Sequence, residues 1–426
     1  MVILKKLKLI KLNELSNKIG SLASIQIFNY IFAIITIPYL TRILGSNSYG
    51  EVVFMQVILI FLNLIADIGV SWYSTREISI NRNNLFAVSK IFWQSWILQW
   101  VIFFILSICL LLISSTKIHH ISGFNLLLFL LPSVFGYILY PIWLFHGLEL
   151  MKLSAMIFLI SRILSLPFLY LLVSDSRDIE GALIFNSLPY IIAGVFSLYK
   201  INKNNYIIFT PINNRELILF YKKTYTYFIS KASISLYNIV IPFALGFFGG
   251  NEQLAYFNLA EKVKLMVLSI YTPITQALTP KMVYFVHNDY SKFISFAKKT
   301  ILIQTIILFP IGIILNIFSE EIITLLAGDK FIIASDTLKI LSFTPWIISV
   351  SNVLGHLMML SLGFTKQYNV TNFSALVLSF LLIYIFKNDL TSVLTSYIVL
   401  LVEILFMIVF LLITIKYKMF SLKINK

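Results

Sequence analysis

The sequence predicts an all-α membrane protein, and its composition and patterning carry this prediction. Hydrophobic residues make up 59% of the 426 residues and charged residues only 12%, about half the charged fraction of an ordinary soluble domain. Apolar runs of about eighteen or more residues recur along the whole chain, and each is long enough to cross the hydrocarbon core as a helix. The alternation over roughly ten residues that is typical of transmembrane β-strands does not occur.

The apolar runs predict about twelve transmembrane helices joined by short loops. The N-terminus is basic and precedes an apolar stretch, as in a signal peptide. However, the stretch from Gly20 to Leu40 is too long and has no small-x-small cleavage motif near its end, so we expect a retained first helix. The eighth helix exceeds the bilayer thickness and is expected to tilt or project. The expected spans are 20–41, 49–72, 91–114, 124–146, 152–173, 179–199, 225–248, 254–284, 294–318, 338–362, 367–387 and 391–415.

The longest connection divides the predicted helices into two pseudo-symmetric halves of six. It runs from Lys200 to Lys223 and contains Pro211, the one proline outside the expected spans. The expected organisation is a basic cytoplasmic N-terminus (1–19), a first six-helix half (20–199), a cytoplasmic linker (200–224), a second six-helix half (225–415) and a basic cytoplasmic C-terminus (416–426).

The positions of Lys and Arg predict that both termini are cytoplasmic. Basic residues gather in the N-terminal tail, the linker, the segment 281–299 and the C-terminal tail, whereas acids such as Asp175 and Glu320 lie in the opposite loops. The formal net charge of +15 reflects this asymmetry and attraction to anionic headgroups. Because the charges are dispersed over separate loops, they do not form the single basic patch of a nucleic-acid-binding protein.

An internal repeat supports the division into halves. Ser21-Leu-Ala-Ser-Ile-Gln-Ile-Phe-Asn29 aligns with Ser230-Lys-Ala-Ser-Ile-Ser-Leu-Tyr-Asn238 and shares Ser, Ala, Ser, Ile and Asn with it. Further along, Gly45-Ser-Asn-Ser-Tyr-Gly50 resembles Gly250-Asn-Glu-Gln-Leu-Ala255. Parallel repeats with a substrate path between them are the layout of an alternating-access transporter. Chance similarity in a strongly apolar chain is the alternative.

Ionisable side chains at bilayer depth are the candidates for function, because each costs at least about 2.5–3.5 kcal/mol to insert. Arg42 and Arg76 lie near helix ends, where their side chains can reach the interface. The residues deeper in the expected spans are Asp67, Arg162, Lys231, Glu261, Lys262, Lys264 and Glu403.

The densest group of these charges lies in the eighth expected helix. Glu261 and Lys264 are three residues apart, share a face and can neutralise each other. Lys262 is then left without a partner on its own helix and is the better candidate for contacting an anion, although both lysines could instead reach the interface. Lys231 occupies the position that Leu22 has in the first repeat, and this difference favours a functional role for Lys231 over a requirement of the fold. The alternative is that the Lys231 side chain reaches the membrane interface.

Two more charges lie near the middle of expected helices. Arg162 is too deep to reach the interface easily, so we expect it to face a cavity or to pair with Asp67 or Glu403. Glu403 has no basic residue nearby in sequence. A buried carboxylate binds a proton more readily than an exposed one, which makes Glu403 a candidate for proton coupling. A structural contact with Arg162 or another polar group is the favoured interpretation.

Little in the sequence favours an enzyme. The histidines do not stand at metal-ligand spacing, and no glycine-rich phosphate loop is present, so we expect no metal or other cofactor. The longest loop expected on the extracytoplasmic side of the membrane, Ser319–Thr337, is short for a membrane glycan polymerase or ligase. The single cysteine, Cys109, excludes an intrachain disulfide.

Several motifs carry a resemblance to a known family. They are Pro38-Tyr-Leu-Thr-Arg-Ile-Leu-Gly45 followed by Tyr49-Gly50, Asp67-Ile-Gly69 followed by Ser74-Thr-Arg-Glu77, and Tyr256-Phe-Asn-Leu-Ala-Glu-Lys262 followed by Pro273-Ile-Thr-Gln-Ala277 and Pro280. Together with the twelve-helix layout, these motifs resemble the polysaccharide transporter family of the multidrug/oligosaccharidyl-lipid/polysaccharide exporter superfamily, and most of all its O-antigen flippases of the Wzx type. Beyond the eighth helix the resemblance is generic.

The resemblance implies a flippase that moves undecaprenyl-diphosphate-linked oligosaccharide from the cytoplasmic to the periplasmic leaflet of the bacterial inner membrane, coupled to an ion gradient. A polysaccharide polymerase and a chain-length regulator are the partners it implies. Cationic side chains would offer charge-assisted hydrogen bonds to the diphosphate. The candidate substrate-binding residues are Arg42, Arg76, Lys231, Lys262 and Arg162, and the candidate ion-coupling residues are Glu403, Asp67 and Glu261.

Two other functions remain open at this point. A cation- or proton-coupled multidrug exporter of the same superfamily should carry acids in its cavity, whereas the intramembrane charges of this chain are more basic than acidic. A membrane glycan polymerase or ligase is disfavoured by the short loops.

Overall fold

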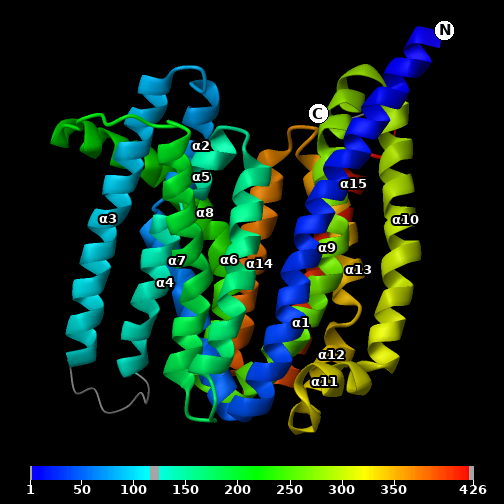
Figure 1. Cartoon of the computed structure of the whole chain (residues 1–426). Coiled ribbons are helices and arrows are strands. Elements are labelled where there is room, and N and C mark those ends of the chain that lie inside the picture. Colours follow the sequence, from blue (N-terminus) through cyan, green and yellow to red (C-terminus); the bar gives the residue numbers. More distant parts are fainter. Residues whose placement is uncertain (1, 116–123, 422–426) are drawn as a thin grey trace. The chain divides into compact units, whose positions relative to one another are not determined.

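The computed structural model describes residues 2–115 and 124–421, and every regular element in these ranges is helical (Figure 1). The all-α class is therefore confirmed. The α-helices are α1 (Val2–Asp67), α2 (Val70–Ile80), α3 (Leu85–Ser115), α4 (Leu131–Leu139), α5 (Ile142–Gly147), α6 (Met151–Leu172), α7 (Ile179–Lys203), α8 (Asn214–Ala244), α9 (Asn251–Asn288), α10 (Tyr290–Ile317), α11 (Ser319–Ala327), α12 (Ala334–Leu341), α13 (Thr344–Asn352), α14 (Thr365–Ile385) and α15 (Ser392–Lys416). The shorter 3₁₀ and π segments are Phe124–Leu130, Leu245–Gly249, Asp329–Phe331, Val353–Met359 and Lys387–Asp389.

Within the described ranges, nine helical stretches are long and apolar enough to cross a membrane. The helices α8, of 31 residues, and α9, of 38 residues, are long as well but carry more polar side chains. On α3, large apolar side chains such as Phe104 (61% exposed) and Leu112 (62%) point outward, as expected of a surface that faces lipid. The chain is a multi-pass membrane protein. The count of twelve spans and the cytoplasmic termini remain predictions, and the termini lie partly outside the described residues, at 1 and 422–426.

Helix boundaries agree with the expected spans at some places and differ at others. The first two spans correspond to two helices that meet at Gly45 within α1, where the backbone is not helical, and the second of these helices ends at Asp67. The fourth span is divided at Tyr140 and Pro141, because proline has no N–H to continue a helix. The helix α8 begins at Asn214, inside the stretch expected to be a linker. Hydropathy marks where a helix leaves the membrane, and polar residues can extend the same helix further.

The repeat predicts that Gly45 and Gly250 are equivalent, and their backbones agree. Gly45 has φ 74° and ψ 179°, and Gly250 has φ 88° and ψ 170°, a conformation essentially confined to glycine. A Cβ at either position would meet nothing within 4 Å, so the backbone conformation, and not crowding, requires glycine. Gly328 adopts the same conformation after α11. This glycine conformation therefore also occurs at a helix boundary that is not part of the repeat. The side chains of 21–29 lie outside the described residues.

Grouping by contact divides the chain into two compact units. Unit 1 comprises residues 1–39 and 244–426, and unit 2 comprises residues 40–243. The core of unit 2 contains Phe92, Trp143 and Phe145, among others. The core of unit 1 includes Phe293, Leu357 and Phe410. The chain thus passes between the units inside α1 and at the end of α8. The six-helix halves remain a prediction, because contact groups record packing and not repetition.

Candidate functional site

Unit 2 contains a cavity of about 820 Å³ between α2, α4, α5 and α8. This volume lies within the range of small-molecule sites, roughly 300–1,000 Å³. The polar lining residues are Ser71, Thr75, Arg76 and Ser79 from α2, Tyr137 from α4, His146 and Glu149 from α5 and the turn after it, and Tyr227 and Lys231 from α8.

A buried ion pair holds one wall of this cavity. The Asp67 side chain is fully buried, and its Oδ2 lies 2.8 Å from Lys231 Nζ, whose side chain is 22% exposed. The second carboxylate oxygen, Oδ1, accepts hydrogen bonds from the Ser71 backbone N–H (3.1 Å), from the Ser71 hydroxyl and from the Tyr137 hydroxyl (3.2 Å). A buried ion pair is tolerated when such additional hydrogen bonds complete it. Asp67 therefore fixes the Lys231 ammonium at the cavity wall.

The turn between α1 and α2 explains how Asp67 reaches α8. After Asp67 the chain turns through Ile68 (φ 39°) and Gly69 (φ 79°) before α2 begins. A Cβ on Gly69 would lie 2.2 Å from the Thr224 carbonyl oxygen and 2.6 Å from the Phe228 backbone nitrogen. Glycine thus permits both the backbone conformation and the close approach to α8. This contact gives the Asp67-Ile-Gly69 motif a physical role, since it brings the carboxylate within reach of Lys231.

The cavity exposes two cationic groups, Lys231 and Arg76. The Arg76 guanidinium lies 2.6 Å from Glu77, yet its side chain remains 59% exposed. A guanidinium carries five N–H donors, so one carboxylate partner leaves donors for a ligand. Glu149, a lining residue as well, pairs with Arg82 at 2.6 Å and is 64% exposed. Lys231 and Arg76 line the cavity, whereas their acidic partners, Asp67 and Glu77, do not.

Ser71 and Tyr137, which donate to Asp67 Oδ1, are not among the candidates that the sequence indicates. Ser71 stands four residues after Asp67, so helical spacing could have found it. Tyr137 comes from α4, 70 residues away, and no local pattern in the sequence indicates it. Thr75 on α2 is fixed in a similar way, because its hydroxyl donates to the Trp143 carbonyl at 3.2 Å.

A second ion pair lies in unit 1. Lys264 Nζ is 2.7 Å from Glu261 Oε2 on the same face of α9, as the three-residue spacing predicts. The Lys264 side chain is 7% exposed and that of Glu261 is 26% exposed. Glu261 Oε2 makes no hydrogen bond of acceptable geometry within the described part of the chain, so charge attraction holds this pair.

The remaining candidates do not line the unit 2 cavity. Arg162 on α6 places its guanidinium 4.8 Å from the centre of the Phe158 ring, and cation–π attraction stabilises a cation there. Glu403 on α15 is buried and Lys262 on α9 is partly buried, while Arg42 is exposed shortly before the kink in α1. Their roles as substrate-binding or ion-coupling residues remain predictions. Among the described residues, no three His, Cys, Asp or Glu side chains gather as metal ligands.

Comparison with known proteins identifies the family. The family described as "Polysaccharide biosynthesis protein" matches residues 15–286. The chain belongs to this family. It is also 26% identical over 364 residues, covering 85% of this chain and 88% of the other, to the "Putative O-antigen transporter" of Escherichia coli (strain K12). These findings confirm the resemblance indicated by the motifs.

Solved structures show the same fold. A multidrug resistance MATE family transporter of the MOP superfamily in an inward-facing conformation gives a TM-score of 0.75 at 15% identity, covering 93% of this chain and 95% of that one. The lipid II flippase MurJ in an inward closed conformation gives a TM-score of 0.72 at 15% identity, covering 94% and 88%. This member of the polysaccharide biosynthesis protein family thus has the fold of MOP superfamily transporters.

Proposed function

We propose that this protein is a flippase for a lipid-linked oligosaccharide of a surface polysaccharide such as O-antigen. It would move the undecaprenyl-diphosphate-linked unit from the cytoplasmic to the periplasmic leaflet of the inner membrane by alternating access. The observation that carries the proposal is the unit 2 cavity, where Lys231 and Arg76 present cationic groups beside the candidate membrane span Asn125–Gly147. The names of two similar proteins, an O-antigen transporter described as putative and a lipid II flippase, support it.

The cavity suits a diphosphate because its exposed donors are charged and of two kinds. The Arg76 guanidinium can bind two phosphate oxygens at once, and the Lys231 ammonium can act as a compact point charge. A bound diphosphate would compete with Asp67 for Lys231. Asp67 would keep its hydrogen bonds from Ser71 and Tyr137, which lowers the cost of releasing the lysine. The Asp67–Lys231 pair is therefore the element that we expect substrate to rearrange.

The proposed flippase would be coupled to an ion gradient and would deliver the flipped unit to other proteins of polysaccharide synthesis. Glu403, Asp67 and Glu261 are the acids at bilayer depth that could bind a coupling ion. A polymerase and a chain-length regulator would receive the flipped unit. Collapse of the proton or sodium gradient in membrane vesicles should stop flipping if coupling operates, and substitution of Glu403 by Gln should then remove the dependence on the gradient.

The fold of a multidrug transporter supports a second function, export of a drug cation. An exporter of cations needs an accessible acid in its cavity. In unit 2, Asp67 is fully buried behind Lys231. Glu149, which is 64% exposed and paired with Arg82, is the one acid among the lining residues, against the two cations Arg76 and Lys231. The described charges of this cavity favour an anionic ligand.

The test is complementation of a deletion strain in the native polysaccharide cluster. Wild type, Arg76→Gln and Lys90→Gln would be compared by surface polysaccharide and by the lipid-linked unit in each leaflet. Lys90 is the matched control, because it is also a cation in an ion pair but lies outside the cavity. We expect the deletion to trap units in the cytoplasmic leaflet, Arg76→Gln to restore transport about tenfold less well than wild type, and Lys90→Gln to restore it fully.

Three results would overturn the proposal. Single units that reach the periplasm without being joined would indicate a polymerase. Unchanged surface polysaccharide with increased drug sensitivity would indicate the drug exporter. Equal failure of Arg76→Gln and Lys90→Gln at normal protein levels would remove the cavity from the transport path.

A further inference from the structure

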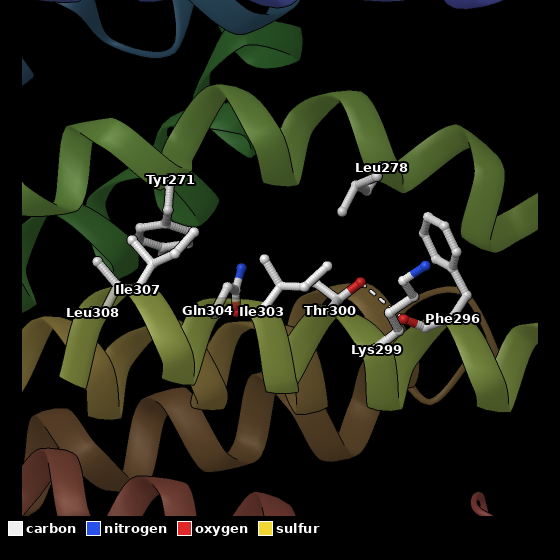
Figure 2. A pocket seen from close by; sticks show the side chains of 9 residues that line it. All are labelled: Tyr271, Leu278, Phe296, Lys299, Thr300, Ile303, Gln304, Ile307 and Leu308. Carbon is white, nitrogen blue, oxygen red and sulfur yellow. Dashed lines mark hydrogen bonds between the residues drawn. The ribbon is translucent and has the colours of Figure 1, made fainter. Parts of the chain in front are cut away.

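Unit 1 contains a second, smaller cavity that the proposed function does not use. It has a volume of about 300 Å³ and lies between α9 and α10, which pack against each other (Figure 2). Leu278, Phe296, Ile303, Ile307 and Leu308 give it a mostly apolar lining. The polar groups that reach it are Tyr271, Lys299, Thr300 and Gln304.

Gln304 is the anomaly in this cavity. Its side chain is 5% exposed, and neither Nε2 nor Oε1 has a hydrogen-bond partner among the described residues. The other buried polar groups are satisfied: the Thr300 hydroxyl donates to the Phe296 carbonyl at 2.8 Å, and the Tyr271 hydroxyl accepts from Asn352 at 2.9 Å. A buried amide without partners is costly. The unused hydrogen bonds of Gln304 therefore point to a ligand in the cavity.

Lys299 supplies a positive charge at one end of the cavity. It stands five residues before Gln304, which corresponds to about 7.5 Å along α10. Figure 2 shows Lys299 and Gln304 both extending from α10 toward α9. The sequence of groups along the helix is thus a cation, then an amide, then the apolar side chains of Ile307 and Leu308. This order matches an amphipathic ligand with an anionic end and an apolar tail.

The mouth of the cavity opens on an apolar surface. Ile303 and Ile307 line the cavity, yet they are 46% and 45% exposed. Next to them, Leu302 (58% exposed) and Ile306 (63% exposed) continue the apolar outer face of α10. Because such a face is in contact with lipid in a membrane protein, a ligand would enter from the bilayer and not from water.

We propose that this cavity binds one acyl chain of an anionic diacylglycerophospholipid. The phosphate lies at Lys299, an ester carbonyl accepts a hydrogen bond from Gln304 Nε2, and the chain runs past Ile307 and Leu308. A polyprenyl diphosphate also has an apolar tail and phosphates but has no carbonyl to offer the amide. A buried N–H without a partner is rarer than an incompletely bonded oxygen, so the acceptor is the group that the ligand must supply.

The experiment uses the purified full-length protein in detergent and native mass spectrometry to measure lipid binding. The probes are dioleoyl phosphatidylglycerol, its ether-linked analogue, which lacks ester carbonyls, dioleoyl phosphatidylcholine and undecaprenyl phosphate. Wild type should bind the ester lipid about tenfold more tightly than the ether analogue, the factor expected of one hydrogen bond. It should also prefer phosphatidylglycerol to phosphatidylcholine.

Variants separate the two polar contacts. Gln304→Leu, similar in size but apolar, should abolish the difference between ester and ether lipid. Lys299→Gln should abolish the preference for the anionic headgroup, whereas Lys298→Gln, at a neighbouring lysine outside the cavity, should leave it unchanged. Ile307→Trp, which fills the cavity, should weaken binding of every lipid.

Three outcomes overturn the proposal. Equal binding of ester and ether lipid by wild type would show that no carbonyl is recognised. Tighter binding of undecaprenyl phosphate than of phosphatidylglycerol that Ile307→Trp removes would assign this cavity, and not the one in unit 2, to a polyprenyl tail. Unchanged lipid binding by Gln304→Leu together with a higher melting temperature would show that the amide is an unsatisfied group with no ligand.

Discussion

Two of the ion pairs that the structure describes, one in each unit, are built in opposite ways. Lys231 and Asp67 are 164 residues apart and join α8 to the end of α1. Lys264 and Glu261 are three residues apart on α9. The first pair exists only when unit 2 has folded, whereas the second can form in α9 alone. Only the first pair can hold a tertiary arrangement that substrate binding could alter.

The pairs also differ in which partner is buried. In the first, the acid Asp67 is fully buried and Lys231 is 22% exposed. In the second, the base Lys264 is 7% exposed and the acid Glu261 is 26% exposed. Removing one partner of a buried pair is costly mainly because the other charge stays behind without compensation. The cost should therefore depend on the burial of the charge that remains, and the order of effects should reverse between the two pairs.

The largest effect is expected from Lys231→Met, which leaves the Asp67 carboxylate charged and fully buried. We expect a loss of about 3–5 kcal/mol in the free energy of unfolding, measured by thermal or denaturant unfolding in detergent, together with loss of transport. Asp67→Asn should cost less, because the remaining lysine is partly exposed. The double variant Lys231→Met/Asp67→Asn should recover most of the stability but not the transport. A double variant as unstable as Lys231→Met would show that the stability loss has another source.

The sequence could predict the second pair but not the first. Helical spacing brings Glu261 and Lys264 together, and no feature of the sequence connects residues 67 and 231 by itself. Both are predicted from the sequence to be costly charges at bilayer depth, which stays a prediction, and they are expected in separate roles, Lys231 in substrate binding and Asp67 in ion coupling. The turn at Gly69 decides the outcome, because its lack of a side chain lets Asp67 approach α8. Such a constraint is tertiary and becomes visible only with α8 in place.

The same limit applies to the fold and to the unit 1 cavity. Apolar runs predict helices well because hydrophobic length is a local property. The division at Pro141 and the start of α8 at Asn214 depend on local hydrogen bonding and on polar residues that hydropathy does not weigh. Gln304 was missed because it is uncharged and lies in an apolar run. Its significance depends on the absence of a hydrogen-bond partner among the described residues, which no sequence pattern shows.

In unit 1 we expect a smaller loss of stability, and we expect removal of the acid to cost more than removal of the lysine. Lys264→Met leaves Glu261, which is partly exposed, and should cost about 1–2 kcal/mol, between the values for exposed and buried pairs. Glu261→Gln leaves Lys264, which is more buried, and should cost more than Lys264→Met. The same unfolding assay measures both variants. If Lys264→Met were the costlier of the two, burial of the remaining charge would not control these energies.

The smallest effect is expected from a third pair, at the surface of unit 2. Lys90 on α3 lies 2.7 Å from Glu216 near the start of α8, and both side chains are 37% exposed. The hydrogen bond from Lys90 holds the pKa of Glu216 below its ordinary value. A carboxyl whose pKa is lowered by folding stabilises the protein above its unfolded pKa and loses that effect as the pH falls through the folded pKa.

Glu216→Gln should therefore lower the melting temperature slightly at pH 7, and the difference from wild type should shrink as the pH falls below the ordinary glutamate pKa of about 4.3 and disappear below the lower folded pKa. High salt should reduce it at pH 7 as well, because exposed charges are screened. Since Glu216 and Lys231 both lie on α8, this variant is also the control for nonspecific damage to that helix: transport should persist in Glu216→Gln and be lost in Lys231→Met. A melting difference that survives both acid and salt would mean that Glu216 acts through packing, and a loss of transport would mean that the position of α8, and not the buried pair alone, sets activity.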